Sequence, residues 1–68
     1  MALRYKVNVL EALRAAGYNT TRIRREKLLS ESTLQKLRTG EGISWNNIDA
    51  ICLLLDCQPG DLIEYVKE

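Results

Sequence analysis

The residue types that perform most enzyme chemistry are scarce in this 68-residue sequence, which has no histidine and two cysteines, Cys52 and Cys57. A four-ligand zinc site would therefore need carboxylates to complete it. A serine or cysteine nucleophile would lack its commonest general base. We therefore predict no enzyme, no metal site and no cofactor. We interpret the cysteines as small buried hydrophobic residues, because the cytoplasm keeps thiols reduced.

Basic and acidic residues are segregated along the chain. Residues 1–40 carry nine basic and three acidic residues, a net charge of +6, whereas residues 41–68 carry one and six, a net charge of −5. A basic region suits a polyanionic partner, because each cation placed at a phosphate releases condensed counterions. A solvated basic face explains the same asymmetry equally well.

The chain is long enough for one small domain and too short for two lobes with a cleft between them. Its apolar fraction of 46% is that of an ordinary globular protein. The longest apolar runs fall far short of the roughly 18 residues that a membrane span needs, and no signal peptide opens the sequence. We therefore expect a single domain over residues 1–68, in the cytoplasm and without a membrane partner.

The spacing of apolar residues predicts five helices and hence an all-α fold. Asn19, Ser30 and Ser44 are placed to cap helices, and Gly17 and Gly40 stand where helices end. The expected helices cover about 7–16, 20–26, 31–38 and 45–55, with a last helix that begins at Pro59 and carries Leu62, Ile63 and Tyr65.

Two apolar segments lie outside this helical pattern. Leu28 and Leu29 stand in the connection before Ser30, and we expect them to turn inward. Leu3, Tyr5 and Val7 alternate with polar residues, which predicts a brief edge strand.

Two short helices joined by about three residues, the second capped by serine, have the layout of a helix-turn-helix. The residues from Gly17 to Ile23, those from Leu29 to Gly40 and the tail from Ile43 to Val66 together resemble the small Cro/repressor-type (Xre-like) family. The resemblance spans nearly the whole chain, with the helix-turn-helix at about 19–39. It implies a five-helix lambda-repressor-like domain whose third helix lies in the major groove of double-stranded DNA.

The helical period supports this orientation of the third helix. At about 100° per residue, Ser30, Leu34 and Leu37 share the buried side, while Ser32, Gln35, Lys36 and Thr39 lie opposite. The candidate DNA-binding residues are Thr20, Thr21, Ser30, Glu31, Ser32, Gln35, Lys36, Arg38 and Thr39.

Most of these candidates also have a purely structural interpretation. Glu31 can accept from a cytosine amino group or stabilise the helix N-terminus. Lys36 can donate to guanine or to a phosphate, and Gln35 can read adenine or solvate the helix. Thr20 and Thr21 suit phosphate oxygens and equally suit helix capping.

Two residues depart from the family pattern, because Arg24 stands where a small residue is usual and Leu28 where glycine is usual. An arginine cannot be buried there unpaired, so we expect its guanidinium to reach solvent, DNA, Glu26 or Glu31. Leu28 favours a turn with ordinary dihedral angles and a side chain in the core.

Two further side chains are placed by the same periodicity. Arg38 lies nearer the buried side of the third helix, where it braces the first helix or touches phosphate. Trp45 is in phase with Ile48 and Cys52, so we expect it in the core rather than as a stacking platform.

The leading hypothesis is a sequence-specific DNA-binding transcriptional regulator that binds as a two-fold homodimer, with Tyr65 and the acidic last helix as the candidate seam. The alternative is a protein-interaction module, antitoxin-like or an adaptor, on the same fold. A small hydrolase would need a general base that the sequence lacks.

Overall fold

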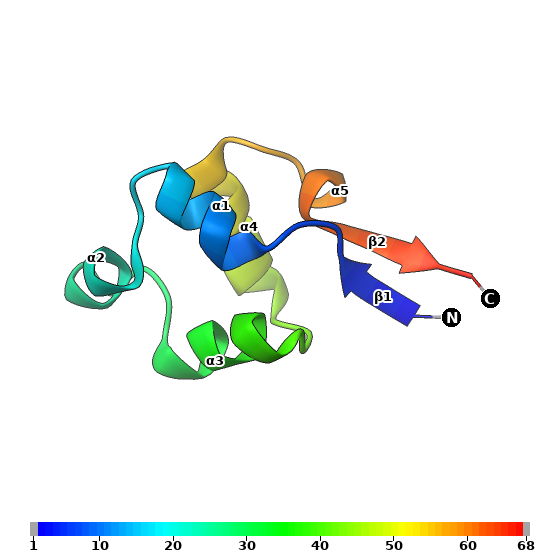
Figure 1. Ribbon diagram of the computed structural model, residues 1–68, viewed down its shortest axis with the longest axis horizontal. Coiled ribbons are helices and arrows are strands. Elements are labelled where there is room, and N and C mark those ends of the chain that lie inside the picture. The colour runs from blue at the N-terminus through cyan, green and yellow to red at the C-terminus, as the bar shows by residue number, and fades with distance from the viewer. Residues whose placement is uncertain (1, 68) are drawn as a thin grey trace.

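A computed structural model describes residues 2–67 as five helices and a two-stranded sheet (Figure 1). The helices form one body, and the sheet extends from it so that both chain ends lie on the same side. In chain order the elements are β1 (Ala2–Tyr5), α1 (Val9–Ala15), α2 (Thr20–Arg25), α3 (Glu31–Thr39), α4 (Trp45–Leu55), α5 (Pro59–Leu62) and β2 (Ile63–Val66).

Side-chain caps set the start of α1 to α4. Each cap oxygen accepts from a backbone N–H three residues later, which the helix itself leaves without a partner. The capping residues and their N···O distances are Asn8 (3.1 Å), Asn19 (2.8 Å), Ser30 (3.2 Å) and Ser44 (3.2 Å). The predicted caps at Asn19, Ser30 and Ser44 are therefore confirmed.

These four helices also share one backbone motif at their C-terminal ends. A single residue after each helix adopts the left-handed conformation: Gly17, Lys27, Gly40 and Asp56, with φ of 95°, 56°, 80° and 52°. The next N–H donates to the carbonyl five residues earlier, in the pairs Tyr18–Leu13 (2.8 Å), Leu28–Ile23 (3.0 Å), Glu41–Lys36 (2.9 Å) and Cys57–Cys52 (3.0 Å). This bond defines the Schellman motif, in which the two paired residues commonly pack side chain against side chain.

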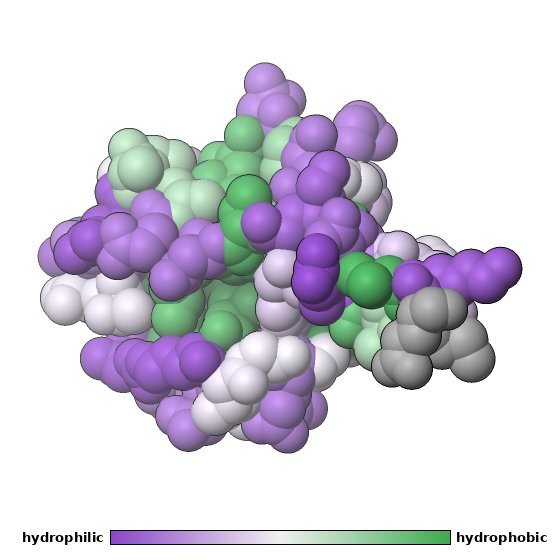
Figure 2. Space-filling model, turned by 45° about the vertical axis from the view of Figure 1, so that its right-hand side comes forward, coloured by the Kyte–Doolittle hydropathy of each residue, from purple (hydrophilic) through white to green (hydrophobic). Residues whose placement is uncertain are grey.

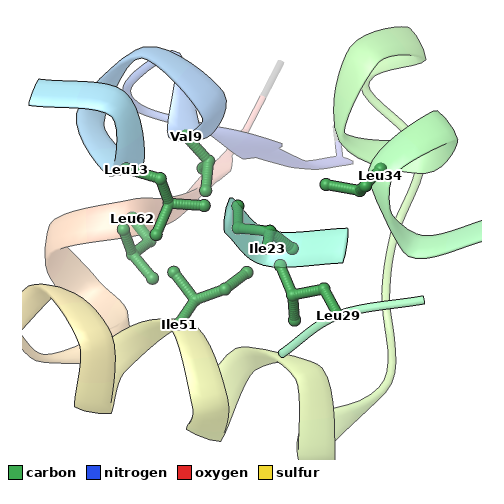
Figure 3. Packing of buried hydrophobic residues seen from close by; sticks show 7 residues of the cluster. All are labelled: Val9, Leu13, Ile23, Leu29, Leu34, Ile51 and Leu62. Carbon is green, nitrogen blue, oxygen red and sulfur yellow. The ribbon is translucent and has the colours of Figure 1, made fainter. Parts of the chain in front are cut away.

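The core is a cluster of seven buried side chains, one or two from each helix and one from the connection before α3 (Figure 3). Burying each of them contributes about 1.5–3 kcal/mol. The predicted anchors in the first three helices are confirmed, and so is the inward turn of the connection, where Leu28 packs against the cluster. The cluster consists of Val9, Leu13, Ile23, Leu29, Leu34, Ile51 and Leu62.

The prediction of an all-α fold is wrong at the C-terminus. The last helix ends at Leu62 instead of running through Tyr65, and β2 pairs antiparallel with β1 so that Leu3 lies opposite Tyr65. Lys6 N donates to Leu62 O at 2.8 Å and continues this pairing past the strand. Because α1 and α5 bring the two ends of the chain together, a short β-rich segment gains a partner there that local propensity does not anticipate. The predicted edge strand near Leu3 is confirmed.

The prediction that Trp45 lies in the core is also wrong, because 91% of this residue is exposed. The fully buried residue of α4 is Ile51, which lies about 120° from Trp45 around the helix. Ile48 and Leu55, which are half-buried, flank Ile51 within about 60°. Ile51 therefore sets the phase of the buried face, and the first residue of the helix falls outside it.

Candidate nucleic-acid interface

The residues from Thr20 to Thr39 form two helices joined by a turn that packs closely on the core. Lys27 takes the left-handed position of this turn, one residue before Leu28. Leu28 therefore keeps ordinary dihedral angles and turns its side chain toward the core, as predicted. Ile23, Leu29 and Leu34 are buried on the two sides of the turn. This packing fixes the angle at which α3 stands relative to α2.

The outer face of α3 carries four of the candidate residues. Ser32, Gln35, Lys36 and Thr39 are all exposed, in agreement with the helical period. The Thr39 hydroxyl is occupied, because it donates to Glu41 Oε2 at 2.7 Å and lies within 3.3 Å of the carbonyls of Gln35 and Lys36. Within residues 2–67 the side chains of Gln35 and Lys36 make no hydrogen bond. These two are therefore free to contact a ligand.

A polar network that the sequence did not reveal fixes the start of α3. Thr33 is buried, and its hydroxyl lies 2.9 Å from Ser30 Oγ and accepts from Asn47 Nδ2 at 2.8 Å. Ser30 itself is exposed and serves as the cap, so its predicted place on the buried side is wrong. Asn47 comes from the first turn of α4. The network therefore ties the N-terminus of α3 to α4.

Arg24 and Glu31 form an ion pair across the turn. Arg24 Nε and Nη2 donate to the two oxygens of the Glu31 carboxylate, which resolves the first departure from the family pattern. The other expected partner, Glu26, instead accepts from Arg22 Nε at 2.7 Å. The carboxylate of Glu31 is thus already engaged by a cation of the same unit, although 66% of its side chain is exposed.

The beginning of α2 carries two of the remaining candidates. Asn19 caps this helix, so Thr20 and Thr21 occupy its first two positions without being the cap. Arg22 stacks on Tyr18 at 4.5 Å and donates to Gly17 O at 3.1 Å, which joins α2 to the end of α1. Hydrogen bonding and the charge of Glu26 raise the pKa of Arg22.

Arg38 is exposed, so the expectation that it lies toward the buried side is wrong. It lines a surface hollow between α1 and α3, together with Glu11 and Leu37. No ion pair or hydrogen bond of its side chain occurs within residues 2–67, so the structure shows no brace to α1. Arg38 is therefore one of several cations available at the surface.

The helix-turn-helix combines paired and unpaired cations. Its two carboxylates, those of Glu26 and Glu31, form ion pairs with Arg22 and Arg24. Four other exposed cations have no ion pair among the residues that the structure describes. The lower part of the molecule, where α3 lies, has a mainly hydrophilic surface (Figure 2). These cations are Arg25, Lys27, Lys36 and Arg38.

Comparison with known proteins places the chain in a family. The model of the Cro/C1-type HTH DNA-binding domain matches residues 8–68. No curated protein and no solved structure matches the chain. Over residues 2–67 no helix has the length and apolar character to cross a membrane.

Proposed function

Because this chain belongs to the Cro/C1-type HTH DNA-binding domains, we propose that it is a sequence-specific transcriptional regulator that inserts α3 into the major groove of double-stranded DNA. The observation that carries the proposal is the pair Gln35 and Lys36, exposed and without hydrogen bonds among the described residues, on a helix whose start and middle are held by the rest of the domain. The cap of Ser30 and the Thr33–Asn47 network hold the start of this helix, and Leu34 anchors its middle.

The roles of the other residues follow from what each already contacts. Ser32 lies on the same outer face and can reach base edges or the backbone. Glu31 orients Arg24 toward the DNA rather than reading cytosine itself, because its carboxylate is engaged. Thr20 and Thr21 present hydroxyls and free amides to phosphate oxygens at the start of α2.

The unpaired cations Arg25, Lys27 and Arg38 supply contacts to the phosphate backbone. Such contacts place the protein on the duplex without reading sequence, and their loss weakens binding to all sequences alike. The protein performs no chemistry of its own, and a regulator of this kind acts in the cytoplasm, where it meets the DNA.

The homodimer belongs to the same proposal, with the sheet as the seam in place of the last helix. Leu3 and Tyr65 lie opposite each other in the register and are 69% and 59% exposed. Each strand has one outer edge that no described strand pairs. Changing Tyr65 to lysine should shift sedimentation toward the monomer, whereas Leu53→Lys, at another exposed apolar site, should not. A native chain that stays monomeric while it binds a palindromic site would contradict the seam.

The decisive test of the DNA proposal is selection of bound duplexes from a random pool at near-physiological salt. An enriched site establishes sequence-specific binding, and a palindromic one supports two-fold binding as well. The double variant Gln35→Ala with Lys36→Ala should lose about 1–3 kcal/mol for each base contact and reduce the salt dependence. Lys67→Ala removes the same charge far from α3 and is the matched control.

Two results would contradict the proposal. One is recovery of no motif, and the other is unchanged DNA affinity of the double variant at α3. Either would favour a protein-interaction module that docks its partner through residues 41–68.

A further inference from the structure

The end of α4 brings the two thiols of the chain together. Cys57 N donates to Cys52 O at 3.0 Å, Asp56 N donates to Leu53 O at 3.4 Å, and Asp56 has a φ of 52°. These are the two bonds and the left-handed residue of a complete Schellman motif, and Cys52 and Cys57 occupy the positions whose side chains commonly pack together. The backbone therefore holds the two thiols as neighbours.

At the ends of α1 and α2 the same motif pairs apolar residues instead of cysteines. There the paired residues are Leu13 with Tyr18 and Ile23 with Leu28, and the first member of each pair is fully buried. Neither cysteine is fully buried, and both line a surface hollow with Trp45 and Pro59. The sequence-based interpretation as two buried hydrophobic residues is therefore incomplete, because both thiols border solvent.

The surroundings of the thiols are apolar and acidic. Burial raises the pKa of Cys57, and so do the charge and hydrogen bonding of Cys52 and the charges of Asp61 and Asp56. Asp49 lines the same hollow. Such surroundings disfavour a free thiolate and do not penalise an uncharged product of two thiols. They therefore slow the reaction of the two thiols with an oxidant during a brief exposure, and they do not destabilise a disulfide once it has formed.

We propose that Cys52 and Cys57 are a modification site that closes reversibly into an intrachain disulfide under a sustained supply of hydrogen peroxide. The thiolate of one cysteine attacks a peroxide oxygen, breaks the O–O bond and becomes a sulfenic acid, and the released hydroxide takes up a proton to give water. The sulfur of the second cysteine then attacks the sulfenic sulfur and expels a second water. In total the two cysteines lose two electrons and two protons, the peroxide becomes two waters, and a thiol reductant reverses the change.

The native fold favours this bond by holding its two ends together. The equilibrium constant for closing the disulfide in a glutathione buffer should therefore be at least about tenfold larger in the native chain than in the same chain in urea. By the closed thermodynamic cycle, the oxidised chain should be more resistant to unfolding by the same factor, about 1.4 kcal/mol.

The experiment oxidises the reduced chain with hydrogen peroxide and separately equilibrates it in glutathione buffers with and without urea. Intact mass, thiol alkylation and non-reducing denaturing electrophoresis follow the product. The expected product is a single chain, not crosslinked to another, that has lost two hydrogens, resists alkylation and recovers its thiols with dithiothreitol. The matched control, Cys52→Ala with Leu53→Cys, keeps two cysteines but moves one to an exposed position whose side chain the motif does not pair with residue 57. Its native and unfolded constants should agree within about twofold.

Three outcomes would overturn the proposal. These are an equilibrium constant no larger in the native chain than in urea, crosslinks between chains as the main product, and irreversible oxidation of single cysteines without a disulfide. Because the wild-type constant is measured first, the conclusion does not depend on whether the control variant folds.

Discussion

The connection from α2 to α3 and the connection from α4 to α5 have the same backbone motif but side chains of different chemistry. Each begins with a non-glycine residue in the left-handed conformation, Lys27 or Asp56, and each closes the same backbone hydrogen bond at 3.0 Å. The first pairs Ile23 with Leu28 among basic residues, and the second pairs two cysteines among acidic ones. The difference shows that the cap motif fixes where two side chains meet, while their types decide whether the place is inert or reactive.

The largest expected effect comes from truncating the first member of each pair. Ile23→Ala should lower the free energy of unfolding by about 2–5 kcal/mol, because a fully buried side chain leaves a cavity. Cys52→Ala should cost less than about 1.5 kcal/mol, since the cysteine is smaller and half-buried. Urea denaturation of both variants measures the two losses. Equal losses would mean that the second cap is as much a part of the core as the first.

The polar network at the start of α3 accounts for the next largest difference in stability, because no buried polar side chain ties α5 to its neighbours in the part of the chain that the structure describes. Thr33→Val should cost about 1–3 kcal/mol by leaving Asn47 without its acceptor. Thr39→Val removes a hydroxyl at an exposed site and should cost less than about 0.5 kcal/mol. Thermal unfolding of the pair checks this. A loss at Thr33 no greater than that at Thr39 would exclude a structural role for the network.

Replacing each left-handed residue by glycine sharpens the comparison. Lys27→Gly and Asp56→Gly should each raise the free energy of unfolding by about 0.5–1 kcal/mol, because glycine adopts a positive φ without steric cost. Lys27→Gly should also weaken DNA binding, whereas Asp56→Gly should not, because only Lys27 lies in the helix-turn-helix. Calorimetry and a DNA titration measure both properties. Equal DNA affinity of the two variants would remove Lys27 from the interface.

The effect of pH is the smallest, and Tyr5, the residue that tests it, lies outside both connections. Burial raises the pKa of Tyr5, whose hydroxyl donates to Glu41 O at 2.6 Å. Because the folded state favours the protonated phenol, this contribution to stability is complete below the ordinary pKa near 10 and is lost as the pH rises through the higher folded value. Cys57, whose pKa is also raised, acts in the same direction. Urea denaturation at pH 8 to 11 should show a shallower decline for Tyr5→Phe than for the native chain, and an equal decline would contradict the assignment.

Local rules were sufficient to predict the first four helices to within two residues at each end. Asn19, Ser30 and Ser44 act on backbone groups three residues away, and Gly17 and Gly40 act at their own positions, so sequence windows of a few residues contain the whole interaction. The outward face of α3 was predictable for the same reason. The left-handed conformations of Lys27 and Asp56 were not, because lysine rarely adopts a positive φ and aspartate, although enriched among non-glycine residues there, adopts it at only a few positions.

The predictions that failed concern features that depend on contacts between residues far apart in the sequence. β2 forms because β1, about 60 residues earlier, lies beside it. The buried Thr33 and its partner Asn47 are 14 residues apart on separate helices, and the choice of Glu31 over Glu26 by Arg24 depends on the angle between α2 and α3. The phase of α4 is set by the burial of Ile51 in the core that it shares with the other helices, which a helical pattern read alone does not fix.

The pairing of β1 with β2 has a consequence for the order in which the domain forms during synthesis. The partner of Ala2 is Val66, which leaves the ribosome 64 residues later. The helices contain their own hydrogen bonds and can form as they emerge, but β1 cannot pair until β2 has emerged. Closure of the sheet therefore reports that all five helices between the strands have been synthesised, and a chain truncated before Ile63 would leave β1 without its partner.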